Sequence, residues 1–207
     1  MGGGFGGKES QGNALACACA IAAVRNNSTV KMRYDRDDDM KITGKRHDFR
    51  IEYTAGFDEL GTIKALDVKH YVRCGWSQDL SLPVADRAML HADNCYHIPN
   101  FRVESHRLKT NTQSATAFRG FGGPQHYFAL ERLVHQIAFE LDLDALDVIK
   151  VNLLEKKQFP YSSPSGALLD SGDFQKLVRK VVKSSTYKNI LKKKNNAIKN
   201  GKIYGIG

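Results

Sequence analysis

The sequence has no long apolar segment and only four cysteines. No run of about 18 apolar residues occurs among its 207 residues, so we expect no membrane-spanning helix. The N-terminus lacks the basic-then-apolar order of a signal peptide, which argues against secretion. The cysteines form no C-x-x-C pair and give no zinc or iron–sulfur signature, which indicates a reduced, cytoplasmic protein; they are Cys17, Cys19, Cys74 and Cys95.

The positive charge is concentrated at one end of the chain. In total 31 Lys and Arg stand against 22 Asp and Glu, for a net charge of +9. Ten of the bases but only one acid, Asp173, fall in residues 171–207, which leaves 21 bases and 21 acids in residues 1–170. The neutral body argues against a nucleic-acid-binding protein, and the Lys-rich tail is typical of a solvated helix face.

Hydrophobic periodicity predicts a mixed α/β (α+β) fold in which a hairpin-rich sheet is flanked by helices. A long β-hairpin is expected over residues 49–76, turning at 58–61. The other expected strands lie at 29–35, within 96–110 and at 203–207. The expected helices lie at 9–27, 82–93, 125–143 and 144–154, with one or two basic helices over 173–202. Residues 36–48 are expected to form a charged connector that has room for a helical turn.

Two of these helices carry a further expectation about burial. The helix at 9–27 consists of small apolar residues throughout, so we expect it to be buried, with its cysteines as small buried thiols. The helix at 125–143 is expected to bury an amphipathic stripe, which comprises Phe128, Leu130, Leu133, Val134, Ile137 and Leu141.

The segment 157–170 is rich in Pro, Ser and Gly and is the best candidate for a linker. It would separate a first subdomain, residues 1–156, from the start of a second one, residues 171–207. The chain begins on a loop and stops on an expected strand, so it has the pattern of a piece of a longer protein.

The tetrapeptide Gly-Phe-Gly-Gly occurs twice, at residues 4–7 and 120–123, and each copy precedes an expected helix. Glycines let a backbone adopt positive φ angles and approach a ligand closely. A helix N-terminus adds free N–H groups and the positive end of a dipole. Two such loops would grip an anionic cofactor from two sides, and Arg119 supplies a permanent cation beside the second loop.

Three other interpretations of these glycines remain open at this stage. Gly2, Gly4 and Gly7 satisfy G-x-G-x-x-G, but no strand precedes them as a dinucleotide fold requires. Gly7-Lys8 resembles the end of a P-loop, but Glu9 stands where the Mg²⁺-binding hydroxyl belongs. A nucleotide-phosphate binder is therefore one alternative, and tight turns that only let helices pack closely are another.

Four longer motifs occur together in this order: GGGFGGKE, DRDDDMKITGKRHDF, DRAMLHADNCYHIPN and TNTQSATAFRGFGGPQ. Together they resemble the molybdopterin-binding portion of the xanthine dehydrogenase/aldehyde oxidase family. The resemblance is dense over residues 1–155 and looser over the basic tail. It implies an incomplete molybdenum-cofactor-binding fold, with 1–156 as the C-terminal part of one molybdopterin-binding subdomain and 171–207 as the start of the next.

The resemblance implies molybdenum-molybdopterin as the cofactor. The dithiolene of the pterin holds the metal in this family, so no direct side-chain ligand is needed. Carried over by motif, Phe5 and Gly6 present backbone to the molybdenum centre, and Arg119 contacts it from the second loop. Phe5 and Arg119 are thus the expected contacts of the metal centre.

The resemblance also assigns substrate and catalytic roles. Glu9 matches the family's acidic residue that hydrogen-bonds the purine, and Arg87 matches the arginine that stabilises charge developing on a purine oxygen. Phe121 matches the aromatic residue that packs against the substrate ring. Aldehyde oxidases of the family carry apolar residues at the positions of Glu9 and Arg87, so both charges favour a purine hydroxylase.

The implied activity is the oxidation of xanthine or hypoxanthine with oxygen derived from water. FAD and 2Fe-2S clusters are expected on other domains or subunits, and the complete protein is expected to be an oligomer without nucleic-acid or membrane partners. The family's glutamate base and a metal-contacting glutamine match nothing in this chain, so we expect the chain alone to be inactive. An aldehyde oxidase-type hydroxylase and a non-catalytic remnant of such a subunit are the alternatives.

Overall fold

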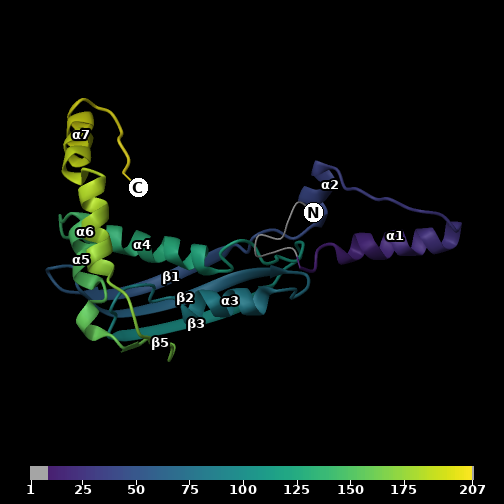
Figure 1. Cartoon of the computed structure of the whole chain (residues 1–207), viewed down its shortest axis with the longest axis horizontal. Coiled ribbons are helices and arrows are strands. Elements are labelled where there is room, and N and C mark those ends of the chain that lie inside the picture. The colour runs from purple at the N-terminus through teal and green to yellow at the C-terminus, as the bar shows by residue number, and fades with distance from the viewer. Residues whose placement is uncertain (1–8, 207) are drawn as a thin grey trace.

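The structure is a computed structural model that describes residues 9–206 (Figure 1). Its helices are α1 (Asn13–Asn26), α2 (Arg36–Ile42), α3 (Ser81–Leu90), α4 (Gly123–Glu140), α5 (Ala145–Asn152), α6 (Phe174–Ser184) and α7 (Tyr187–Lys199), with a 3₁₀ turn at Lys156–Gln158. Its strands are β1 (Phe49–Phe57), β2 (Ile63–Gly75), β3 (Asn100–Lys109), β4 (Tyr161–Ser162) and β5 (Leu168–Leu169). Among these helices none is long and apolar enough to cross a membrane.

The main sheet has the order β1-β2-β3. β1 and β2 form the long antiparallel hairpin that the sequence predicts, and β3 joins β2 in parallel after the chain has crossed over through α3. The hairpin turn is held by Asp58, whose Oδ1 accepts the N–H groups of Leu60 and Thr62 at 3.1 and 2.9 Å. The mixed α/β class is therefore confirmed, with one long hairpin at its centre.

Within residues 9–206 helices cover one face of this sheet and leave the other uncovered. Alternate residues of β2 point inward and are buried, including Leu66, Val68 and Val72. On this face α4 packs against β1 and β2, and α3 packs beside it through Ala85. The opposite face carries charged side chains such as Arg102 and Glu104, which pair with each other. The sheet therefore has one helical layer and one polar face.

Two buried histidines join the covering helices to the sheet. His126 of α4 donates from Nε2 to the carbonyl of Ala92, which follows α3, at 2.7 Å. Its Nδ1 must therefore accept, and it lies 2.9 Å from Nε2 of His70 on β2. His70 then donates, and its own Nδ1 is buried without a partner in the described part of the chain. Burial lowers the pKa of both histidines, which favours the neutral form of each ring in this arrangement.

A buried asparagine ties α5 to the hairpin. Asn152 donates to the carbonyls of Gly61 and Val148 at 2.8 Å each, and its Oδ1 accepts the N–H of Ile63 at 2.8 Å. Both donors and one acceptor position of this amide are thereby used inside the core, which fixes the turn of the hairpin against the helical layer.

Helix α1 forms as predicted but is not buried. It ends at Asn26 and is capped by Asn27, which adopts a left-handed conformation (φ 47°) and donates its backbone N–H to the carbonyl of Ala23. Ile21 is 59% exposed and Val24 83% exposed, and Cys17 is exposed as well. The helix extends away from the sheet, at the opposite end of the molecule from α6 and α7 (Figure 1). Its alanines stabilise a helix locally, but no described segment covers it.

Other expectations about single segments were wrong. Residues 29–35 and 203–206 form no strand, because no neighbouring strand pairs with them. Phe128 is 78% exposed and does not belong to the buried stripe of α4. It precedes Leu130 by two residues, which places it about 200° around the helix from that buried position. The remaining members of the stripe pack in the core as predicted.

The charged connector and the basic tail both have the helical character that the sequence predicts. The connector at 36–48 contains α2, and the tail forms α6 and α7. Phe174 and Val178 of α6 pack against the main core. The proposed linker contains the 3₁₀ turn and the short β4–β5 pair, and the boundaries of the two subdomains stay predictions.

The histidine pair should make stability depend on pH. Burial, and secondarily the neighbouring His126, lower the pKa of His70 from 6.5 to about 4. Unfolding then takes up a proton in this window, so stability is lost as pH falls from 6.5 towards 4, by about 2 kcal/mol at pH 5. A glutamine in place of His70 can still donate a hydrogen bond to His126, but its amide does not titrate in this pH range. We therefore expect His70→Gln to reduce the loss between pH 7.5 and 5 by about this amount, measured by urea unfolding.

The matched control is His135→Gln, which changes an exposed histidine of α4, the helix that also carries His126. It should leave the pH dependence of unfolding as it is in the wild type. Equal pH dependence in the wild type and in His70→Gln would contradict the role given to the buried pair.

Candidate functional site

The second glycine loop makes a tight left-handed turn into α4. Gly120, Phe121 and Gly122 have φ angles of 91°, 49° and 92° in succession. The Phe121 N–H donates to the carbonyl of Phe118 at 2.8 Å, and the Gly123 N–H donates to that of Gly120 at 3.0 Å. Positive φ is easy for glycine and uncommon for phenylalanine, so the two flanking glycines hold Phe121 in this unusual conformation.

This loop lies directly against α3. A Cβ built on Gly122 would overlap the carbonyl oxygen of Val84. A Cβ on Gly123 would lie 2.6 Å from Nη1 of Arg87, and that same nitrogen donates to the carbonyl of Gly120. The structure therefore brings the half-buried Arg87 to the loop that carries Phe121, although 33 residues separate Arg87 from Gly120 in the sequence.

Arg119 is exposed, and its backbone is held by a second arginine. Nη2 of Arg46 donates to the Arg119 carbonyl at 2.6 Å, and the Arg46 guanidinium stands 4.4 Å from the ring centre of Phe118. Nη1 of Arg46 is buried with no partner in the described part of the chain. Sequence reasoning missed Arg46, because nothing in the local pattern of residues 36–48 links it to the second loop.

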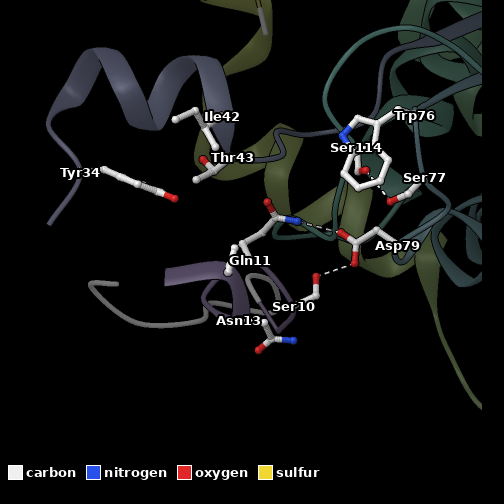
Figure 2. Close-up of a pocket in the computed structure, with 11 residues that line it drawn as sticks. Ser10, Gln11, Asn13, Tyr34, Ile42, Thr43, Trp76, Ser77, Asp79 and Ser114 are labelled. Carbon is white, nitrogen blue, oxygen red and sulfur yellow. Dashed lines mark hydrogen bonds between the residues drawn. The ribbon is translucent and has the colours of Figure 1, made fainter. Parts of the chain in front are cut away.

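The first glycine loop and its expected cofactor contacts, Phe5 and Gly6, lie outside the described residues. Glu9 is described and exposed. No ion pair joins Glu9 to Arg87 within residues 9–206. The residues that follow Glu9 are anchored instead: Ser10 Oγ and Gln11 Nε2 both donate to the carboxylate of Asp79 (Figure 2).

Gln11 lines two cavities. One has a volume of about 340 Å³ and is lined by Ser10, Trp76 and Asp79 among others (Figure 2). The other, of about 360 Å³, is lined by Arg46, Phe118 and Thr116. The hydroxyl of Thr116 is buried there without a partner in the described part of the chain. Both cavities therefore present polar groups rather than a purely apolar surface.

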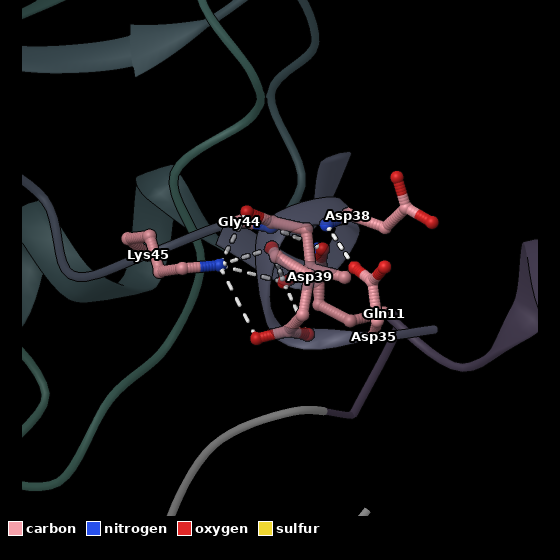
Figure 3. Close-up of polar contacts among 7 residues, drawn as sticks. Gln11, Asp35, Asp38, Asp39, Gly44 and Lys45 are labelled. Carbon is pink, nitrogen blue, oxygen red and sulfur yellow. Dashed lines mark hydrogen bonds and ion pairs between the residues drawn. The ribbon is translucent and has the colours of Figure 1, made fainter. Parts of the chain in front are cut away.

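A local polar network orders α2 and the segment that joins it to β1 (Figure 3). Asp35 caps α2 by accepting the N–H of Asp38 at 2.8 Å. Nζ of Lys45 donates to the carbonyls of Asp39 and Thr43 at 2.7 and 2.9 Å. These contacts fix the backbone immediately before Arg46, and so they support the guanidinium that holds the second loop.

Within residues 9–206 no three or more His, Cys, Asp or Glu side chains lie together as a metal site. The donors on the protein side are the exposed Arg119, the unpartnered Nη1 of Arg46 and the N-terminus of α4, all of which suit an anion.

The close approach of the loop to α3 predicts a specific sensitivity to substitution. Gly122→Ala would meet both the strain of positive φ and the Val84 carbonyl. Gly166 has a similar φ of 84°, but nothing lies within 4 Å of a Cβ built on it. The variant Gly166→Ala therefore measures the cost of positive φ without any steric contact. We expect Gly166→Ala to lower the free energy of unfolding by about 1–2 kcal/mol and Gly122→Ala by about 2 kcal/mol more. Urea unfolding measures both, and equal losses would contradict the close contact.

Comparisons with known proteins agree with this geometry. The family model described as the molybdopterin cofactor-binding domain matches residues 1–153. The chain is 51% identical over 152 residues to a xanthine dehydrogenase of Drosophila subobscura, covering 73% of this chain and 11% of that protein. It is 44% identical over 156 residues to a xanthine dehydrogenase/oxidase of Felis catus, covering 75% and 12%. The chain thus spans only about an eighth or less of the length of these relatives.

Solved structures give the same fold over nearly the whole chain. A CO dehydrogenase from Oligotropha carboxidovorans matches with a TM-score of 0.84 at 24% identity, covering 97% of this chain and 26% of that one. An aldehyde oxidoreductase from Desulfovibrio gigas matches with a TM-score of 0.76 at 27% identity, covering 95% and 21%. Together with the match over residues 1–153, these likenesses show that the chain belongs to the molybdopterin cofactor-binding domain family.

Proposed function

We propose that this chain is part of a molybdenum-dependent purine hydroxylase and forms one wall of its cofactor and substrate site. The observation that carries the proposal is the bond from Arg87 to the carbonyl of Gly120, next to Phe121. This contact places the cation of Arg87 beside the loop that carries the aromatic ring of Phe121, although the two residues belong to different motifs. The 51% identity to a xanthine dehydrogenase supports xanthine or hypoxanthine as the substrate.

The donor set fits an anionic, phosphate-bearing pterin. Arg119 and Arg46 offer cationic N–H groups, and the turn into α4 offers a helix N-terminus with no side-chain cap. When bound, molybdopterin supplies the metal that oxidises the substrate carbon. The role of this chain is to hold and orient the cofactor from the second loop, while Phe5 and Gly6 would do so from the first.

Arg87 can hold the loop and bind substrate at the same time. A guanidinium has five N–H donors, and the bond to Gly120 uses Nη1 only. The remaining donors would stabilise negative charge on a purine oxygen. Phe121 would pack on the ring of the purine, and Glu9 would hydrogen-bond its polar edge. An aldehyde lacks that edge, so Glu9 and Arg87 favour the purine over the aldehyde alternative.

The rest of the reaction is assigned to other parts of the complete enzyme. Because the chain covers 11–12% of its curated relatives, we place the general base, FAD and 2Fe-2S clusters on segments or subunits beyond this chain. Residues 9–206 alone would then bind and orient without turning over substrate. An oligomeric and cytoplasmic enzyme is part of the same proposal.

The test exchanges the two charges for apolar side chains in a complete subunit that carries this chain. Glu9→Val combined with Arg87→Met should lower kcat/KM for xanthine by about 100-fold or more, because two hydrogen bonds to charged groups are lost. The kcat/KM for an aromatic aldehyde should fall by much less, because the aldehyde makes neither bond and loses only the support that Arg87 gives to the loop at Gly120.

Arg179→Met is the matched control, since Arg179 is exposed on α6 and makes no polar contact among the described residues. It should leave both substrates unaffected. A parallel loss for xanthine and aldehyde in the double variant would argue against a purine-specific role for Glu9 and Arg87.

A further inference from the structure

The carboxylate of Asp79 anchors the chain immediately after Glu9. Asp79 lies in the connection between β2 and α3 and accepts hydrogen bonds from Ser10 Oγ and, at 3.0 Å, from Gln11 Nε2 (Figure 2). These contacts join segments 68 and 69 residues apart in sequence. Two donors on one carboxylate restrict both the position and the direction of the backbone that leaves Glu9.

The other end of the Gln11 amide holds a second segment. Its Oε1 accepts the N–H of Gly44 at 2.6 Å. Gly44 precedes Lys45 and Arg46, and Arg46 in turn holds the Arg119 carbonyl at 2.6 Å. A Cβ on Gly44 would overlap the carbonyl of Ser114, so this backbone has little room to shift. One side chain, Gln11, therefore links the N-terminal segment to the support of the second glycine loop.

The Asp79 end of this link is itself fixed. Asp79 has a φ of 40°, which is uncommon for a residue other than glycine. Two hydrogen bonds hold the connection around it. The hydroxyl of Ser77 lies 2.6 Å from the hydroxyl of Ser114, and the backbone N–H of Trp76 donates to the backbone carbonyl of Thr112 at 2.9 Å. Helix α3 starts at Ser81 and carries Arg87. The anchor is thus built on the same rigid segment as that arginine.

We propose that Ser10, Gln11 and Asp79 form a clamp that sets Glu9 relative to Arg87 and the second glycine loop. Gln11 and Asp79 are positioning residues: they act on substrate through Glu9 and touch no substrate themselves. The role of Glu9 in this inference rests on the proposed function, whereas the clamp as a structural device does not.

The test replaces the hydrogen-bond donor of Gln11 by an acceptor in the complete subunit. Gln11→Glu places two carboxylates against each other, because the amide donor that now lies 3.0 Å from Asp79 becomes an acceptor. We expect amide hydrogen exchange in peptides covering residues 9–12 and 44–46 to accelerate about 10-fold. The double variant Gln11→Glu, Asp79→Asn restores one donor facing one acceptor, so exchange should return to within about 3-fold of the wild type.

Gln78→Glu is the matched control. It makes the same chemical change one residue from Asp79, but the Gln78 side chain is exposed and makes no hydrogen bond among the described residues. Its exchange should equal that of the wild type. Unchanged exchange in Gln11→Glu, or a double variant no better than Gln11→Glu, would overturn the clamp.

Kinetics separate positioning from general stability. If Gln11 acts through Glu9, Gln11→Glu should lower kcat/KM for xanthine in the wild-type background but have no further effect once Glu9→Val is present. Equal effects in both backgrounds would overturn the positioning role. If Glu9→Val alone leaves xanthine oxidation unchanged, the proposed function fails, while the exchange experiment still decides whether the clamp exists.

Discussion

The close backbone contact between the second glycine loop and α3 is the constraint on which the site depends. Gly122 approaches the carbonyl of Val84 so closely that no side chain fits between them. This proximity lets Arg87 reach the carbonyl of Gly120, beside Phe121 in its left-handed conformation. A loop with any larger residue at position 122 would have to move away from α3 and lose the arginine.

The rest of the fold keeps these two elements at a fixed distance. Helices α3 and α4 cover the same face of the sheet, and the neutral His70–His126 pair connects β2, α4 and the end of α3 in one buried chain of hydrogen bonds. Polar groups buried in this way must find partners, so the pairing favours one arrangement of the layers over others. The rigid half of the site is therefore a property of the core.

The N-terminal half of the site is held differently. Glu9 belongs to a segment that reaches the body through side-chain hydrogen bonds to Asp79 and Gly44, and the helix that follows, α1, is exposed. Directional polar contacts can set the position of a short segment without burying it. The substrate contact proposed for Glu9 needs a carboxylate that is held in position and still exposed, and this segment meets both conditions.

The sequence by itself determined the local elements: alternation specified the β1–β2 hairpin, and the 3.6-residue period specified α4 and its stripe from Leu130 to Leu141. Its long motifs also indicated the family, since residue identity at a site is chemical information that needs no coordinates. Only the tertiary structure decided that α1 is exposed, that Phe128 faces outward, and that residues 29–35 find no strand to pair with. The links from Arg46 to Arg119 and from Gln11 to Asp79 likewise required it, because they join residues 73 and 68 positions apart. Periodicity reports only neighbours along the chain, whereas burial and pairing depend on which distant segments the fold brings together.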